Sequence, residues 1–256
     1  MENKGGENMN LEHVVAVRPS KTIYKDGDTL IKLFNESYSV SSVLSEALNQ
    51  ARIMETGLNI PALKEVSKLD GKWVILMDYI EGKTLEQLIV ENPDKTDEYL
   101  KIFVDEQVKM HSKRSTLLRK LHDKMEDKIE KLSLSDSVKF DLKSKLAGLK
   151  KHNKVLHGDY QLSNVIVAKS GEVYILDWAH ATQGNASADA AMSYLLMKLG
   201  KKDGLAEKYL DLFCESTKTD KRYVQTWIPI VAASHLEKYQ GAEREMLETF
   251  VNVVEY

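Results

Sequence analysis

The residues best suited to chemistry lie in two short stretches, HGDYQLSN (residues 157–164) and ILDWAH (residues 175–180). They contain two carboxylates, Asp159 and Asp177, and the carboxamide of Asn164. All three adjoin short apolar segments predicted to be strands, where loops present side chains for function. The spacing suits phosphoryl transfer. One Asp accepts or orients a hydroxyl proton, while an Asn five residues later and a second Asp supply hard oxygen ligands to Mg²⁺.

Taken together, these strings resemble the aminoglycoside phosphotransferase/choline kinase family, a branch of the protein-kinase-like fold. The family pattern is roughly H-G-D-x-x-x-x-N, an apolar strand, a hairpin and an apolar residue before D-W. The resemblance implies that Asp159 is the catalytic base, that Asn164 and Asp177 hold Mg²⁺, and that His157 braces the loop. It also implies ATP as phosphoryl donor, with GTP as an open alternative. The competing interpretation is that Asp159 and Asp177 are loop or cap residues of an unrelated fold.

A lysine inside an apolar strand is the next part that a kinase-like site requires. Lys32 lies in Thr29–Phe34, whose sequence TLIKLF is otherwise apolar, so its ammonium group needs a partner. Glu46 is the candidate, because it lies on the next predicted helix beside Leu44 and Leu48, which are expected to form the core face. Such a pair would position the nucleotide phosphates. The alternative is that Lys32 extends to solvent at a strand edge.

The segment VILMDYIEG resembles the hinge of this family, an apolar strand followed by an extended stretch and Gly. The resemblance implies that adenine pairs with backbone groups of Asp78 and Ile80, with Met77 at the back of the pocket. A buried strand that ends in a loop explains the same residues. The loop that covers the phosphates in protein kinases is rich in Gly, whereas the corresponding R-P-S-K segment has none. Ser20 in that segment is a candidate hydrogen-bond donor to phosphate, and a plain turn is the alternative.

Two Asp-Gly pairs, Asp26-Gly27 and Asp70-Gly71, predict two β-hairpins with type I′ turns in the first third of the chain. The predicted segments are strands at 21–25, 28–34, 62–69 and 72–79, and a helix at 42–56. Most of the sequence from 84 to 153 is charged and helical, with a long amphipathic helix predicted at 116–132. Strands return at 155–156, 165–168 and 172–176, and the chain is helical again from 186.

The predicted fold class is therefore α+β. The family resemblance makes it a protein-kinase-like bilobal fold, with a small antiparallel β-sheet N-lobe and a helical C-lobe. The expected parts are a flexible N-terminal tail at 1–12, a nucleotide-binding N-lobe at 13–80, and a C-lobe at 81–256. The C-lobe would carry the catalytic loop, the metal site and the acceptor-substrate helices.

Composition narrows the class of protein. The chain has 256 residues, with 36 Lys plus Arg against 39 Asp plus Glu, a net charge of −3. This balance gives no general electrostatic reason to bind nucleic acid. No apolar run approaches the ~18 residues of a membrane span, and no signal-peptide core is seen. The single cysteine, Cys214, excludes an intramolecular disulfide. We expect a cytoplasmic protein without membrane or nucleic-acid partners; the oligomeric state stays open.

Several other residues are expected to be structural. Asp189 matches the Asp that follows D-W in the family and is expected to cap or brace a helix. Trp227 and Tyr223 lie where the family builds its acceptor pocket; they are interpreted either as core or as a cage for a quaternary ammonium. Four histidines without metal-ligand spacing are expected to be mostly solvated: His111, His122, His152 and His235.

Three functions remain open. The leading one is an ATP-dependent kinase for a hydroxyl of a small molecule, and the acceptor (aminoglycoside, choline or ethanolamine, homoserine, sugar) is not determined. A polycationic acceptor is disfavoured, because residues 201–256 hold 10 acidic and 8 basic residues, a weak excess. A protein kinase is opposed by Trp-Ala after Asp177 and by the lack of an Ala-Pro-Glu segment. A non-catalytic nucleotide-binding regulatory module is opposed by the complete set of catalytic positions.

Overall fold

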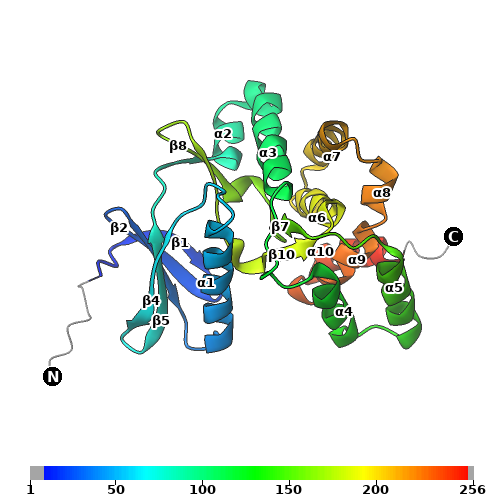
Figure 1. The fold of residues 1–256 in the computed structure, drawn as a ribbon, viewed down its shortest axis with the longest axis horizontal. Helices are drawn as coiled ribbons and strands as arrows, with labels where there is room; N and C mark the ends of the chain where they lie inside the picture. The colour runs from blue at the N-terminus through cyan, green and yellow to red at the C-terminus, as the bar shows by residue number, and fades with distance from the viewer. Residues whose placement is uncertain (1–8, 253–256) are drawn as a thin grey trace. The chain divides into compact units, whose positions relative to one another are not determined.

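The structure, a computed structural model, describes residues 9–252. The chain divides into two compact units (Figure 1). The first contains the residues up to Thr84 together with Asn164–His180, and the second contains Leu85–Ser163 and the residues from Ala181 onward. The predicted N-terminal tail lies largely outside the described residues.

A five-stranded antiparallel sheet forms most of the first unit, in the order β1-β2-β3-β5-β4. Its strands are β1 (His13–Arg18), β2 (Lys21–Asp26), β3 (Thr29–Phe34), β4 (Leu63–Leu69) and β5 (Lys72–Asp78). Both predicted hairpins are present. Asp70 and Gly71 both have positive φ, 49° and 82°, as a type I′ turn requires. The first turn differs, because its central residues are Gly27 and Asp28 and only Gly27 has positive φ. That combination of φ signs belongs to a type II′ turn.

Helix α1 (Val40–Met54) packs on this sheet and begins at Ser39, whose hydroxyl accepts a hydrogen bond from the Ser42 amide (Figure 1). The prediction that Leu44 and Leu48 form its core face is wrong, since their side chains are 46% and 49% exposed. The helix is rotated so that its neighbouring stripe is buried instead. The core under the helix consists of Phe34, Val43, Ala47, Ile75 and Met77.

A second small sheet completes the first unit. It has the order β6-β8-β9, with β6 (Gly82–Thr84), β8 (Val165–Ala168) and β9 (Val173–Ile175). A Cβ placed at Gly82 would lie 2.2 Å from the carbonyl oxygen of Val167, so only glycine allows these strands to pair. Two 3₁₀ turns, η2 (Leu162–Asn164) and η3 (Trp178–His180), contain the last three residues of each of the two sequence motifs.

The second unit is helical, with one two-stranded antiparallel sheet of β7 (Lys154–Leu156) and β10 (Thr182–Gly184). Helix α6 (Ala186–Leu199) forms its centre, where nearly every side chain is buried. The long helix predicted at 116–132 is shorter, because residues 113–120 form an irregular segment before α4. The other helices are α2 (Leu85–Glu91), η1 (Pro93–Lys95), α3 (Thr96–His111), α4 (Leu121–Lys131), α5 (Asp136–Gly148), α7 (Asp203–Thr217), α8 (Lys221–Gln225), α9 (Ile228–Ala233), η4 (Leu236–Lys238) and α10 (Gly241–Asn252).

Among the described residues, no helix combines the length and the apolar character needed to cross a membrane.

Candidate active site

The central feature of the first unit is a buried lysine between two carboxylates. The Lys32 ammonium lies 2.7 Å from Glu46 Oε1 and 3.2 Å from Asp177 Oδ1. Strand β3 supplies the lysine, α1 supplies the glutamate, and the segment after β9 supplies the aspartate. Lys32 and Glu46 are each only 4% exposed. A buried charge requires a partner of opposite sign, and here the lysine has two.

Charge and burial act in opposite directions on Lys32. Burial alone lowers the pKa of its ammonium group, but Asp177 and Glu46 together outweigh it and raise the pKa well above the ordinary value of lysine. Lys32 therefore stays protonated throughout the physiological range. A fixed positive charge of this kind is suited to contact phosphate oxygens.

A second lysine joins this cluster and was not predicted. The Lys21 ammonium lies 2.8 Å from Glu46 Oε1 and 3.9 Å from Asp177 Oδ1. The hairpin register contains the signal for it. Ile23 on β2 pairs with Lys32 on β3, so both side chains lie on one face of the sheet. Lys21 is two residues from Ile23 on the same strand and therefore lies on that face too.

Asp177 occupies an unusual backbone conformation. Its φ is +60°, in the left-handed region that non-glycine residues rarely adopt. The segment around it is held on both sides. The Trp178 indole donates to the Ile175 carbonyl at 3.0 Å, and the side chain of Asn49 on α1 donates to the Ala179 carbonyl at 3.2 Å. The carboxylate of Asp177 is thus held in place while remaining 38% exposed.

Asn164 ends η2, immediately before β8, and is tied to the segment around Asp177, since the Leu176 amide donates to the Asn164 carbonyl at 2.8 Å. Its carboxamide and the Asp177 carboxylate are both hard oxygen donors, which Mg²⁺ prefers. Within residues 9–252 there is no group of three or more His, Cys, Asp or Glu able to hold a metal by themselves. This donor set fits Mg²⁺, which proteins commonly bind through one or two carboxylates plus substrate phosphates.

The predicted hinge residues follow one another at the end of β5. Met77 is buried in the core under α1, and Ile80 is half-buried. The Asp78 amide donates to the Ala62 carbonyl at 2.9 Å, and the Asp78 carboxylate accepts from the Ala62 amide at 3.2 Å. Ser20 lies in the turn between β1 and β2. The nucleotide-binding roles of these residues stay predictions.

The loop around Asp159 belongs to the second unit. The backbone amide of Asp159 donates to Nδ1 of His157 at 3.2 Å, and the Gln161 side chain donates to Asp159 Oδ1 at 2.7 Å. Gly158 between them has φ +77°, which its lack of a Cβ makes inexpensive. The buried His157 ring therefore braces the loop through a backbone hydrogen bond, as expected.

Asp189 on α6 holds this loop through its backbone amides. Its carboxylate accepts the amides of His157 at 3.1 Å and Gly158 at 2.7 Å, and lies 3.1 Å from Nε2 of His111. It thus braces the loop, whereas the cap of α6 is Asn185. Burial raises the pKa of the Asp189 carboxyl, but the hydrogen bond and charge of His111, with smaller effects of His157 and Gly158, lower it overall.

The prediction that the four histidines are mostly solvated is wrong. Among them only His152 is exposed; the others are buried: His111, His122 and His235. Spacing along the chain does not reveal burial here, because the rings of His111 and His122 contact residues distant in the sequence, Asp189 and Trp227.

We predict that Asp189→Asn destabilises the protein by ~3 kcal/mol at pH 7, because the carboxamide places a donor among buried donors and removes a buried charge. The carboxyl has a lowered pKa when folded, so its contribution is present above the unfolded value of 3.8 and is lost as the pH falls through the folded value. The difference from wild type should therefore narrow below pH 3.8. Urea denaturation of both proteins at a series of pH values measures this difference in the free energy of unfolding. Asp123→Asn, at an exposed position on α4, is the control, and equal stability of the two variants would contradict the prediction.

Basic groups of α4 lie in the electrostatic surroundings of Asp159. The pKa of Lys124 is lowered to about 8, first by burial and then by Lys128 and Arg119, while Asp189 and Asp159 act in the opposite direction. Lys128 follows one turn later and donates to the Ser234 carbonyl at 3.0 Å.

The two aromatic residues considered for the acceptor pocket have structural positions. Trp227 is fully buried and meets the ring of His122 edge-on at 5.7 Å, so it belongs to the core. The Tyr223 hydroxyl accepts a hydrogen bond from Asn185 at 2.7 Å.

The fold and its motifs define the class of this protein: a phosphotransferase with a protein-kinase-like architecture. The chain belongs to the phosphotransferase enzyme family (APH), whose model matches residues 21–227. A search of curated proteins found no match.

Solved structures agree with this fold. A choline/ethanolamine kinase family protein from Mesorhizobium loti has a TM-score of 0.63 at 13% identity, covering 97% of this chain and 90% of its own. The choline kinase LicA from Streptococcus pneumoniae has a TM-score of 0.62 at 13% identity, and the match covers 95% of this chain and 94% of LicA. A thermostable mutant of aminoglycoside phosphotransferase APH(4)-Ia, in complex with ADP and hygromycin B, has a TM-score of 0.68 at 10% identity. The match covers 94% of this chain and 92% of the mutant.

Proposed function

We propose that this protein catalyses ATP-dependent, Mg²⁺-assisted phosphoryl transfer to a hydroxyl group of a small molecule. The observation that carries the proposal is the buried Lys32 ammonium between Glu46 and Asp177. A lysine held by a helix glutamate, next to an aspartate that can hold Mg²⁺, is the arrangement used for phosphoryl transfer from a nucleotide.

Each residue then has a distinct role. Lys32, oriented by Glu46, contacts phosphate oxygens of the nucleotide. Asp177 and Asn164 hold Mg²⁺, which neutralises charge on the phosphates when bound. Asp159 accepts the proton of the attacking hydroxyl, and the hydrogen bond from Gln161 orients its carboxylate.

For the nucleotide base we propose contacts with the backbone of Asp78 and Ile80. The Asp78 amide is already bonded to Ala62, so its carbonyl and the Ile80 amide are the groups we assign to adenine, with Met77 behind them. Ser20 is assigned to the phosphates. APH(4)-Ia has been solved with AMP-PNP and with ADP, which supports an adenine nucleotide here over GTP. A nucleotide-binding N-lobe at 13–80, a C-lobe at 81–256 and a cytoplasmic location complete the proposal.

The acceptor is best described by its charge. Lys124, which shares its surroundings with Asp159, keeps most of its positive charge at neutral pH and repels a polycation. The burial of Trp227 removes one aromatic face that a quaternary ammonium requires. We therefore propose a neutral or anionic hydroxyl compound as acceptor, rather than an aminoglycoside or choline.

A panel of candidate acceptors, scored by ATP depletion, tests both the kinase function and the proposed class of acceptor. We expect depletion with neutral or anionic compounds such as sugars and hydroxy acids, and at least about tenfold less with aminoglycosides and choline, a difference of ~1.4 kcal/mol. Depletion at background across the panel contradicts the kinase function and favours a regulatory nucleotide-binding module. Depletion with aminoglycosides contradicts only the acceptor class. A peptide array, expected to remain unphosphorylated, excludes a protein kinase.

A further inference from the structure

A basic pocket in the second unit is lined by residues that have no role assigned so far. Its volume is about 510 Å³, and its lining is Arg114, Lys151, His152, Asn153 and Lys154. Four of these five residues are able to carry positive charge and none is acidic. The chain as a whole has a net charge of −3, so this concentration is a local feature.

The pocket is assembled from two segments that the backbone joins. The Val155 amide donates to the Lys113 carbonyl at 3.1 Å, and Arg114 pairs with Lys154 in an antiparallel bridge. The other end of the second segment is held by Asn185, which donates to the Lys150 carbonyl at 3.0 Å. The basic side chains thus project from a backbone fixed at both ends.

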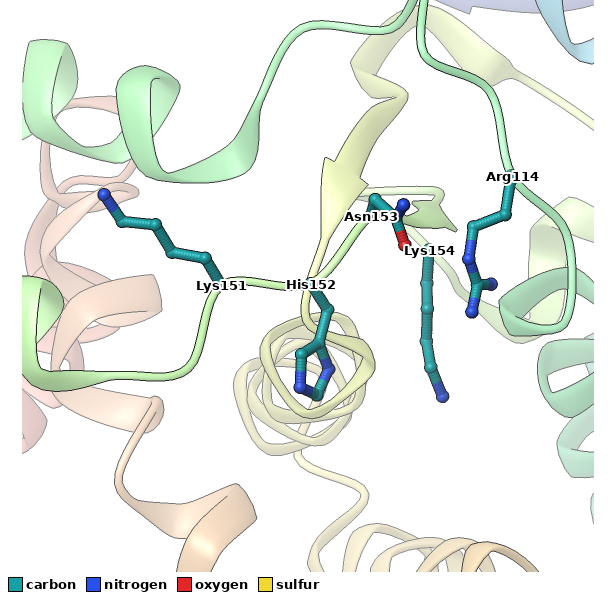
Figure 2. A pocket seen from close by; sticks show the side chains of 5 residues that line it. All are labelled: Arg114, Lys151, His152, Asn153 and Lys154. Carbon is teal, nitrogen blue, oxygen red and sulfur yellow. The ribbon is translucent and has the colours of Figure 1, made fainter.

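Three of these side chains project to the same side of the pocket, those of Arg114, His152 and Lys154, whereas Lys151 extends in another direction (Figure 2). Nη1 of Arg114 donates to the carbonyl of Lys113 at 3.0 Å and more weakly to two carbonyls before it. These bonds orient the guanidinium group. Its Nε and Nη2 groups make no hydrogen bond within residues 9–252, so they can bind a ligand.

Protein carboxylates do not balance this charge. In the part of the chain that the structure describes, no ion pair involves Arg114, Lys150, Lys151 or Lys154, although many other lysines are paired. The effect reaches His152, an exposed side chain whose pKa is lowered by partial desolvation and also by Lys154, Lys150 and Arg114. Every charged group that acts on this histidine is a cation. An anion placed here would relieve repulsion as well as form new hydrogen bonds.

We propose that this pocket binds the phosphate group of a small anionic molecule, through Arg114, His152 and Lys154. A guanidinium presents parallel N–H groups that match phosphate oxygens, and lysine adds a point charge. A volume of about 510 Å³ suits a small ligand, whereas a nucleic-acid backbone requires an extended basic track.

The segments that line the pocket lead directly into the elements that hold the Asp159 loop. Lys154 begins β7, which ends at Leu156, immediately before His157. Arg114 lies three residues after His111, which contacts Asp189, the residue that holds the loop amides. Both sides of the pocket are therefore continuous with elements that fix this loop.

Isothermal titration calorimetry with three probes tests the proposal on the full chain at low salt: inorganic phosphate, glycerol phosphate and pyrophosphate. We expect pyrophosphate to bind most tightly, because two phosphate groups engage more of the cations. Glycerol phosphate binding more tightly than inorganic phosphate would identify a phosphoester as the ligand, and the reverse order would identify free phosphate. Arg114→Gln/Lys154→Gln should weaken pyrophosphate binding at least about tenfold, since the double variant removes two charged hydrogen-bond donors from the pocket.

Two controls separate the pocket from other sites. Lys145→Gln, an exposed lysine on α5 in the same unit, should leave the affinity within about twofold because an exposed charge at a distance is largely screened. Lys154→Gln alone should weaken binding about threefold, as expected for one partly exposed charge, and it leaves the Arg114 bonds to the preceding backbone carbonyls intact. Unchanged pyrophosphate affinity in both pocket variants would overturn the proposal. So would a single-stranded DNA oligonucleotide that binds more tightly than pyrophosphate and depends on the same residues.

Discussion

Replacing Asp159 by Asn is expected to lower turnover by about 10²–10⁴-fold, the usual contribution of a general base, with nucleotide affinity within about twofold. The carboxamide has nearly the shape of the carboxylate but does not take up the hydroxyl proton at neutral pH. The fold around it should survive. The loop is held by the amides of His157 and Gly158 on Asp189, and by the Asp159 amide on His157, all of which are backbone donors.

The measurement is single-turnover phosphorylation of an accepted substrate, with nucleotide affinity determined separately by calorimetry. Asp123→Asn makes the same chemical change at an exposed position of α4 and should be as active as wild type. A fully active Asp159→Asn variant would remove the assignment of Asp159 as base. Loss of nucleotide binding together with turnover would instead show that Asp159 acts through the nucleotide.

Replacing Lys32 by Met is expected to reduce turnover by about 10²–10³-fold, as removal of one preorganised donor to developing charge commonly does. Unlike Asp159→Asn, it should also weaken nucleotide binding. The free energy of unfolding should fall by ~1–3 kcal/mol, less than for a buried ion pair broken outright, because Lys21 still neutralises Glu46 at 2.8 Å. Asp177 keeps its longer contact with Lys21, at 3.9 Å.

The matched control is Lys68→Met on β4 of the same sheet, where the ammonium lies over the Trp73 ring at 5.0 Å. It should leave both activity and nucleotide affinity unchanged. A double-mutant cycle of Lys32→Met with Glu46→Gln should show strong non-additivity, because the two side chains are in direct contact. Additive effects, or an unaltered nucleotide affinity in Lys32→Met, would contradict the assigned role.

The sequence by itself determined the local features. Asp-Gly pairs have strong conformational preferences, so both hairpins of the sheet could be located before any packing was known. The motif around Asp159 and Asp177 could be recognised because phosphoryl transfer demands particular side chains at particular spacings. The pairing of Lys32 with Glu46 was also predictable, since a lysine in an apolar strand needs a carboxylate and few are within reach.

Only the tertiary structure decided which way each element faces. Leu44 and Leu48 satisfy a helical period, but the neighbouring stripe of α1 is the buried one, and it includes Glu46 beside Lys32. Lys21 joins the same cluster through strand register.

Tertiary packing also decided the features of the second unit that the sequence did not reveal. The buried His111, the brace that Asp189 gives the loop, and the pocket formed by Arg114 and Lys154 each bring together residues tens of positions apart. Local sequence specifies turns and reactive groups, because those depend on near neighbours. Burial and charge surroundings depend on segments distant in the chain, so they appear only when those segments pack together.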